Sequence, residues 1–207
     1  MLDPPRSRFD MRALTALLAF ALLAAAAGAA EDAGFIAGVF EPPRAAPELA
    51  LRGSDGNELR LSRYRGKVVI VGFGFTSCPD VCPTTLAALA GARKKLGADA
   101  EGVQVVYVTV DPERDDAERL RTYLRTFDPT FIGGTGTAEQ LAAVRESYGI
   151  AVGQQPGSSF SHSSFTYLID REGRIRALMP YGHSSDDYAH DLRLLLHGAE
   201  RAAVSGR

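Results

Sequence analysis

The chain contains little cysteine, and neither sign of charge dominates its composition. Only 2 of its 207 residues are Cys, too few to staple a small disulfide-rich protein, and a chain of this length can bury a hydrophobic core without such help. Lys and Arg total 23 against 25 Asp and Glu, which gives a formal net charge of -2. Because nucleic-acid-binding domains concentrate positive charge, this balance excludes that class. The two cysteines therefore need another reason to be present.

Signatures of nucleotide binding and of repeat architectures are also missing. Gly72-x-Gly74 and the glycines of residues 133–136 follow neither the dinucleotide-binding pattern nor the phosphate loop with its lysine. We interpret them as glycines of strands and turns. With no internal repeat, and with 45% hydrophobic and 23% charged residues, the composition is that of one ordinary globular domain.

The first thirty residues have the order of an export signal. Three arginines precede an uncharged, apolar stretch over residues 13–30, and an Ala-Gly-Ala sequence at residues 27–29 offers a cleavage pattern. The stretch also reaches the roughly 17 to 18 residues that a bilayer-spanning helix needs. We expect residues 1–30 to be a signal peptide or an N-terminal membrane anchor, and the domain to be exported and periplasmic, either soluble or tethered to the cytoplasmic membrane. Because no cysteine follows the stretch, lipid attachment there is excluded.

The rest of the chain divides into a linker over residues 31–47, a domain over 48–201 and a tail over 202–207. Strand and helix patterns alternate along the domain. The expected elements are a hairpin over 49–61, a strand over 67–75, a helix over 84–96, a strand over 103–110, helices over 115–127 and 137–148, a hairpin over 165–179, and a helix from Ser184 or Ser185 through Leu196. This order predicts an α/β fold, a three-layer sandwich with a mixed central sheet and an N-terminal β-hairpin.

Cys78 and Cys82 lie between the first long strand and the helix after it. One helical turn would place their Cα atoms roughly 6 Å apart, which a disulfide can span. A disulfide that closes so small a loop would stabilise the fold by only about 2 kcal/mol. Stabilisation is therefore a poor explanation for the position of the two cysteines. Pro79 and Pro83 favour a helix start, where the dipole should increase thiolate character. The position indicates redox or metal chemistry, with a structural disulfide or inert thiols as the alternative.

A metal site would need at least one ligand besides the cysteines. Two cysteines cannot complete a tetrahedral zinc site, and a c-type haem needs His directly after Cys-x-x-Cys. His162 is the candidate, because its Ser-rich loop leads into a predicted strand; from the residues alone, an exposed loop histidine is an equally good interpretation. We expect His183, His190 and His197 at the surface; the last two are about 10.8 Å apart along the final helix. Two thiolates with one imidazole favour copper, as Cu(I) or Cu(II), with zinc as a chemical alternative.

Three motifs follow one another along the chain. They are TSCPDVCPT at residues 76–84, Asp-Pro-Glu-Arg-Asp at 111–115, and Ser-His-Ser at 161–163 followed by Tyr-Leu-Ile-Asp at 167–170 and Gly173. Over roughly residues 45–197 the chain resembles the Sco/SenC family of copper-delivery proteins. The resemblance implies a thioredoxin-like fold, copper held by Cys78, Cys82 and His162, and a redox-active disulfide between the two cysteines. It also implies delivery of copper to the dinuclear copper centre of cytochrome c oxidase, or reduction of that centre's cysteines beforehand.

Three acidic residues, Asp80, Asp111 and Glu113, lie within or beside these motifs. The resemblance implies that such acids surround the metal or face a partner protein. From the residues alone, solvated loop charges are an equally good interpretation.

Two functions fit the cysteine pair. The first is a metallochaperone, not an enzyme, that passes copper to the copper-centre subunit of the oxidase, with other periplasmic copper carriers or thiol reductants as further partners. The second is a thiol-disulfide oxidoreductase, in which one thiolate attacks and the other resolves a mixed disulfide. The CxxxC spacing favours the first, as do residues 161–164, where redox proteins of this fold carry a proline. A peroxidase is only weakly indicated, because its Thr-x-x-Cys pattern is imperfectly matched at Thr76 to Cys78.

Overall fold

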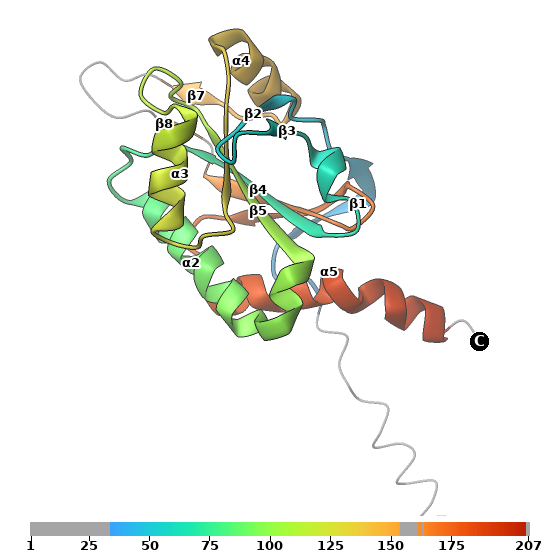
Figure 1. The fold of residues 1–207 in the computed structure, drawn as a ribbon. Coiled ribbons are helices and arrows are strands. Elements are labelled where there is room, and N and C mark those ends of the chain that lie inside the picture. The colour runs from blue at the N-terminus through green and yellow to red at the C-terminus, as the bar shows by residue number, and fades with distance from the viewer. Residues whose placement is uncertain (1–33, 154–160, 163, 206–207) are drawn as a thin grey trace, which may run out of the picture. The chain divides into compact units, whose positions relative to one another are not determined.

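A mixed β-sheet forms the centre of the domain. The computed structural model describes residues 34–153, 161–162 and 164–205, and within them eight strands join in the order β1-β10-β9-β4-β5-β6-β2-β3 (Figure 1). Their bounds are β1 Gly38–Ala45, β2 Leu51–Gly53, β3 Glu58–Leu59, β4 Val68–Gly74, β5 Val103–Thr109, β6 Ile132–Thr135, β9 Phe165–Ile169 and β10 Arg174–Pro180. A second, two-stranded sheet pairs β7, Val152–Gly153, with β8, Ser161–His162.

The central strands of the large sheet are β4 and β5, which run parallel. On its other side, β4 pairs with the antiparallel strand β9. Every residue of β4 and β5 is buried, so both faces of the sheet are covered at this point. Their runs of Val and Ile suit such positions, because β-branched side chains pack well on a pleated surface. The two predicted central strands are confirmed.

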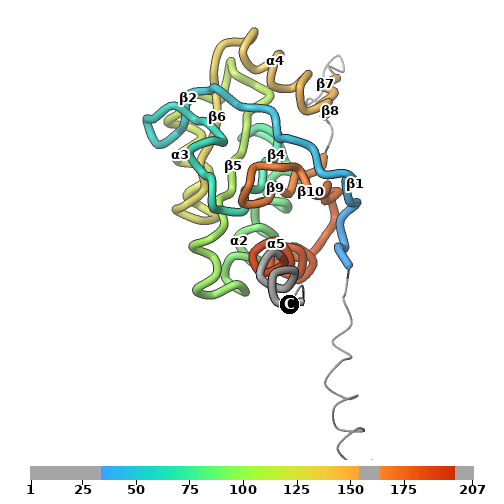
Figure 2. The backbone as a smooth tube through the Cα atoms, turned by 90° about the vertical axis from the view of Figure 1, so that its right-hand side faces the viewer, coloured from blue at the N-terminus to red at the C-terminus, as the bar shows by residue number. Residues whose placement is uncertain are grey.

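Four α-helices flank the sheet in the described part of the chain. They are α2 Val81–Leu96, α3 Ala117–Arg125, α4 Ala138–Ser147 and α5 Ser185–Ser205, with short 3-10 helices η1 Leu61–Tyr64 and η2 Gly97–Gly102. Figures 1 and 2 show α2 and α5 side by side, and Leu86 and Leu192 of these helices are fully buried. Leu120 of α3 packs over Gly133 of β6. Thr137 caps α4 in a capping box, as its sequence pattern predicts.

The predicted α/β architecture with a mixed central sheet is confirmed, including both hairpins. In the first hairpin, β2 and β3 are antiparallel, and Leu51 pairs with Leu59. The second hairpin is formed by β9 and β10. Because β2 also pairs with β6, the N-terminal hairpin extends the main sheet at its edge.

The linker predicted over residues 31–47 is wrong for most of its length. β1 occupies that segment and pairs antiparallel with β10 at the edge of the sheet. Its two prolines suggested irregular chain, yet an edge strand tolerates proline because its outer N–H groups need no partner. Just before β1, the N–H groups of Ile36 and Ala37 donate to the buried carboxylate of Asp191, at 2.9 Å each. The domain therefore begins well before residue 48.

The C-terminal end also differs from the prediction. α5 continues past Leu196 to Ser205 and so enters the predicted tail over residues 202–207. The Ala-rich sequence there favours continued helix. The signal peptide or anchor expected at residues 1–30 lies outside the described residues. Within the described ranges, no helix combines the length and the apolar character needed to cross a membrane.

Candidate functional site

The two cysteines lie where the central strand β4 gives way to helix α2. Cys78 is half-buried in the connecting loop, and Cys82 is buried in the first helical turn. No disulfide joins them, and the backbone N–H of Cys82 donates to Sγ of Cys78 at 3.5 Å. The prediction that the pair sits at a helix N-terminus is confirmed.

The expectation of greater thiolate character is wrong for Cys82. Burial of its sulfur raises the pKa of Cys82 to about 12, although the Tyr107 hydroxyl acts in the opposite direction. Removal from water penalises the charged form more than the first turn of the helix stabilises it. At neutral pH Cys82 therefore keeps its proton in the metal-free protein, and a metal that binds its sulfur must displace that proton.

The cysteine loop is held in place by Asp115, a fully buried carboxylate between β5 and α3. It accepts hydrogen bonds from the backbone N–H of Thr76 at 2.9 Å, from the Thr76 hydroxyl at 2.5 Å and from the Thr109 hydroxyl at 2.8 Å. Arg119 of α3 adds a bond from its Nε to the Thr76 hydroxyl at 2.7 Å. The second strand and its helix thereby fix the chain two residues before Cys78.

Sequence reasoning missed this role of Asp115 and assigned the residue to the start of a helix. The helix cap is instead the next residue, Asp116, whose side chain accepts from the N–H of Arg119 at 2.7 Å. The sequence did contain a signal, because Asp115 and Asp116 are adjacent acids and a helix needs only one of them as its N-cap. The second acid could therefore have been expected to have another role.

Gly74, the last residue of β4, leaves room for the Tyr107 hydroxyl and the Cys82 sulfur. A Cβ atom there would lie 1.8 Å from the Tyr107 hydroxyl oxygen and 2.7 Å from Sγ of Cys82. No side chain fits at that point, so position 74 requires glycine. The same crowding places the Tyr107 hydroxyl against the Cys82 sulfur, a contact that the sequence did not reveal.

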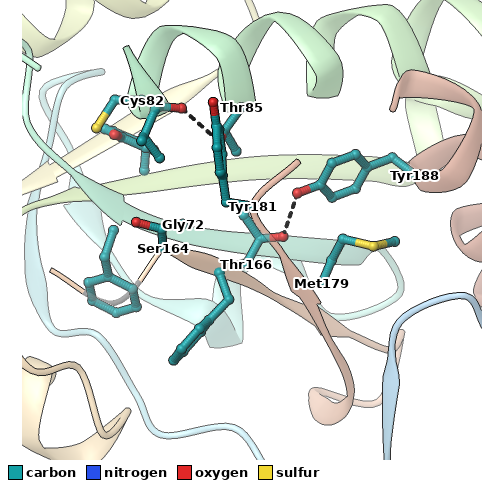
Figure 3. Close-up of a pocket in the computed structure, with 12 residues that line it drawn as sticks. Gly72, Cys82, Thr85, Ser164, Thr166, Met179, Tyr181 and Tyr188 are labelled. Carbon is teal, nitrogen blue, oxygen red and sulfur yellow. Dashed lines mark hydrogen bonds between the residues drawn. The ribbon is translucent and has the colours of Figure 1, made fainter. Parts of the chain in front are cut away.

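A small cavity of about 20 Å³ opens beside Cys82 (Figure 3). Cys82 and Thr85 of α2 line it together with Ser164, just before β9, and Thr166 within β9. The Thr166 hydroxyl forms a hydrogen bond with that of Tyr188 at 3.0 Å. The cavity is about the size of one water molecule. The cavity shows that Ser164, two residues after His162, lies close to Cys82 of helix α2.

The backbone of His162 lies in β8 and pairs with Val152 of β7, while its side chain is outside what the structure describes. Ser164, two positions further along, lines the cavity next to Cys82. Two extended residues span at most about 7 Å, so the His162 backbone lies within that distance of a residue of the cavity wall. The sheet produces this approach, because Thr166 of β9 pairs opposite Gly72 near the end of β4.

The three acids singled out in the sequence differ in their surroundings. Asp111 is 2% exposed, and its carboxylate accepts from Arg114 at 2.8 Å. Asp80 stands at the N-cap of α2 without a side-chain capping bond and is exposed, as is Glu113. Asp111 is therefore a paired structural carboxylate, whereas Asp80 and Glu113 are available to solvent or to a partner.

Two of the remaining histidines are paired with acidic residues. His183 Nδ1 is 3.2 Å from Oδ2 of Asp187 at the start of α5, and His197 Nε2 is 3.0 Å from Oδ2 of Asp99. His190 is half-buried on α5. Among the side chains that the structure describes, no group of three or more His, Cys, Asp and Glu is arranged to hold a metal ion.

Comparison with known proteins finds relatives of the Sco type. A SCO2-like protein of Rickettsia conorii is 34% identical over 133 residues, which cover 61% of this chain and 65% of that protein. The chain thus spans just under two thirds of this relative. The structure of copper-bound ScoI from Bradyrhizobium japonicum matches with a TM-score of 0.68 and 31% identity, covering 73% of this chain and 99% of that one. Apo Sco1 from Thermus thermophilus matches with a TM-score of 0.72 and 36% identity, covering 80% and 99%.

These solved relatives have thioredoxin-like folds, and the predicted fold class is confirmed in full. The SCO1/SenC family model matches residues 41–197, a range that starts inside β1 and contains both cysteines and His162. On the sequence match and the shared fold together, the chain belongs to the SCO1/SenC family.

Proposed function

We propose that this protein is a copper metallochaperone that holds one copper ion with Cys78, Cys82 and His162. The ion is its cargo, and the receiving protein is the copper-centre subunit of cytochrome c oxidase. The observation that carries the proposal is the cavity wall shared by Cys82 and Ser164, two residues after His162. This neighbourhood supports His162 as a ligand, because its backbone lies close in sequence to a residue of that wall, and the two sulfurs lie together at a helix start.

The chemistry of these ligands suits a carrier. Two thiolates bind Cu(I) strongly, and an imidazole supports Cu(II). A copper-bound relative in the same family supports copper over zinc as the metal. The half-buried Cys78, followed by the exposed Pro79 and Asp80, gives a partner access to one side of the site. Transfer then proceeds by exchange of the ligands of this chain for those of the partner.

Copper titration of the purified protein tests the ligand set. We expect His162→Ala to weaken Cu(II) binding more than Cu(I) binding, while Cys78→Ser and Cys82→Ser weaken both severely. His183→Ala is the matched control, because that ring pairs with Asp187, and it should bind copper as the wild type does. Wild-type Cu(II) binding by His162→Ala would remove the third ligand from the proposal.

A thiol-disulfide reductase acting on the cysteines of the oxidase copper centre is the second candidate. It is favoured by one observation, the closeness of the two cysteines, with the Cys82 N–H donating to Sγ of Cys78 at 3.5 Å. Against it stands the protonated state of Cys82, whose raised pKa disfavours the nucleophilic thiolate. Reduction of insulin or of an oxidised copper-centre domain at a rate comparable to thioredoxin would place this activity first.

We also propose that the domain is exported, by a cleaved signal or on an uncleaved anchor formed by residues 1–30. Sequencing of the N-terminus of the mature protein distinguishes the two. A chain that begins near Ala30 or Glu31 indicates cleavage, and an intact Met1 in the membrane fraction indicates an anchor. A protein that stays in the cytoplasm would contradict export.

A further inference from the structure

The hydroxyl of Tyr107 is buried, has no nitrogen or oxygen acceptor among the residues that the structure describes, and interacts only with the sulfur of Cys82. Tyr107 lies in the middle of β5, where its backbone pairs with Gly72, and the residue is 2% exposed. A buried hydroxyl without a good acceptor costs up to about 1–3 kcal/mol relative to one that is well hydrogen-bonded. Such a group in the core needs an explanation.

The position of this hydroxyl is fixed by the backbone around it. Its oxygen and Sγ of Cys82 both crowd the space above Gly74, where a Cβ atom would meet them at 1.8 and 2.7 Å. The Cys82 sulfur is therefore its immediate neighbour. Tyr188, which lines the same cavity, differs in that its hydroxyl is bonded to Thr166 at 3.0 Å.

A cysteine sulfur becomes a stronger hydrogen-bond acceptor when it loses its proton. A neutral thiol accepts hydrogen bonds only weakly, so the Tyr107 hydroxyl has only a weak acceptor in the metal-free protein. A thiolate carries a charge, and hydrogen bonds to charged groups are about twice as strong as neutral ones. Metal binding removes the proton from a cysteine ligand, so the hydroxyl gains a stronger acceptor when the metal is bound.

We propose that Tyr107 is a positioning residue for the copper site, whose hydroxyl donates a hydrogen bond to Sγ of Cys82 when this sulfur is a metal-bound thiolate. The inference rests on the proposed function, because it takes Cys82 as a copper ligand. The phenol is fixed in advance by the sheet and stabilises the loaded state of the protein over the empty one. It also lowers the electron-donating strength of the sulfur toward the metal.

The variant Tyr107→Phe tests this role, because it removes the hydroxyl and keeps the ring. In the metal-free protein we expect a midpoint temperature of unfolding equal to or above that of the wild type, since the buried hydroxyl that is lost is bonded only weakly, to a thiol. Cu(I) affinity, measured by competition with a chromogenic chelator at neutral pH, should fall about tenfold. The thiolate-to-Cu(II) absorption band should move to longer wavelength, because the sulfur becomes a stronger donor.

Tyr188→Phe is the matched control. It removes a buried hydroxyl that has a partner, so it should lower the unfolding temperature and leave both copper readouts unchanged. Copper affinity and band position in Tyr107→Phe equal to those of the wild type would overturn the inference. A Tyr107→Phe protein that unfolds at a lower temperature without metal, while its copper readouts match the wild type, would also overturn the inference. That result would indicate that the hydroxyl has a structural partner, such as a water molecule. Failure of the wild-type protein itself to bind copper would instead refute the proposed function.

Discussion

At the scale of single residues, Asp115 is the strongest determinant of the cysteine loop. Its buried carboxylate accepts three hydrogen bonds, two of them from Thr76. We expect Asp115→Ala to lower the free energy of unfolding by about 3 kcal/mol, because it leaves buried donors without an acceptor. Urea denaturation measures the change, and copper affinity should fall with it because the loop loses its anchor.

Asp116→Ala is the control for this prediction. Asp116 caps α3 from an exposed position, so its loss should cost about 1 kcal/mol and leave copper affinity unchanged. Equal effects of the two substitutions on unfolding and on copper would show that Asp115 is no more than a second helix cap.

Gly74 supplies a second prediction at this scale. In Gly74→Ala the added methyl group would overlap the Tyr107 hydroxyl and the Cys82 sulfur, and overpacking of this kind typically costs about 1–3 kcal/mol. Thermal unfolding should show the loss, together with a changed rate of alkylation of Cys82. Gly38→Ala in β1 is the comparison, because a Cβ there meets only the Leu178 carbonyl oxygen at 3.8 Å. A stable Gly74→Ala protein with unchanged alkylation would contradict the described packing.

The sequence allowed the place of the cysteines to be predicted, but not their protonation. Pro79 and Pro83 mark a helix start, and the helix begins between them at Val81. The pKa of Cys82 depends on burial by β5, which is distant in sequence, and no local pattern reveals that packing. For the same reason the contact with Tyr107 could not be foreseen from its position in an ordinary strand pattern.

At the scale of elements, Asp191 of α5 joins the start of the domain to its last helix. It accepts the N–H groups of Ile36 and Ala37 at 2.9 Å each. In Asp191→Ala these two amides should exchange with solvent deuterium at least about tenfold faster, because a lost bond of roughly 1.4 kcal/mol corresponds to that factor. Asp186→Ala, which removes only an exposed ion pair with Lys95, should leave them unchanged. Slow exchange in Asp191→Ala would contradict the role.

The ion pair of Asp128 with Arg93 connects α2 to the loop before β6, and it predicts a pH dependence. Burial alone would raise the pKa of Asp128, but hydrogen bonds from Thr130 and the charge of Arg93 outweigh it, so the pKa lies below its ordinary value of 3.8. A lowered pKa in the folded state means that the carboxylate contributes stability above about pH 4, and that this contribution is lost as the pH falls further.

The variant Asp128→Asn checks the sign of this effect. Urea unfolding of both proteins between about pH 7 and pH 3 should give a stability difference in favour of the wild type that shrinks toward the acid end. Glu118→Gln, on the exposed face of α3, is the control. A difference that is constant with pH, or that grows on acidification, would show that Asp128 is not stabilised as a carboxylate.

The type of an element could be predicted where its hydrophobic pattern was strong, as in β4 and β5. It was missed where a strand forms only because it pairs with a neighbouring strand. β1 carries two prolines and mostly exposed residues, so nothing in its own sequence favours a strand. Its structure depends on the free edge of β10 and on the Asp191 carboxylate, both contributed by residues more than a hundred positions away.

At the scale of the whole molecule, the candidate copper site depends on chain topology. β4 delivers the cysteine loop, β5 and α3 anchor it through Asp115, and β9 returns antiparallel to β4 so that Ser164 reaches the cavity beside Cys82. The order of the motifs in the sequence predicts such a site through the family resemblance. The convergence itself is a property of the mixed sheet, which residue spacing alone does not encode.

The most direct test of this account is X-ray absorption at the copper edge of the protein loaded with one equivalent of Cu(I). Two sulfur ligands and one imidazole nitrogen are predicted, with one sulfur lost in Cys78→Ser and the imidazole contribution lost in His162→Ala. A spectrum without sulfur ligands, or one in which the imidazole signal persists in His162→Ala, would contradict the claim that these three residues hold the same ion.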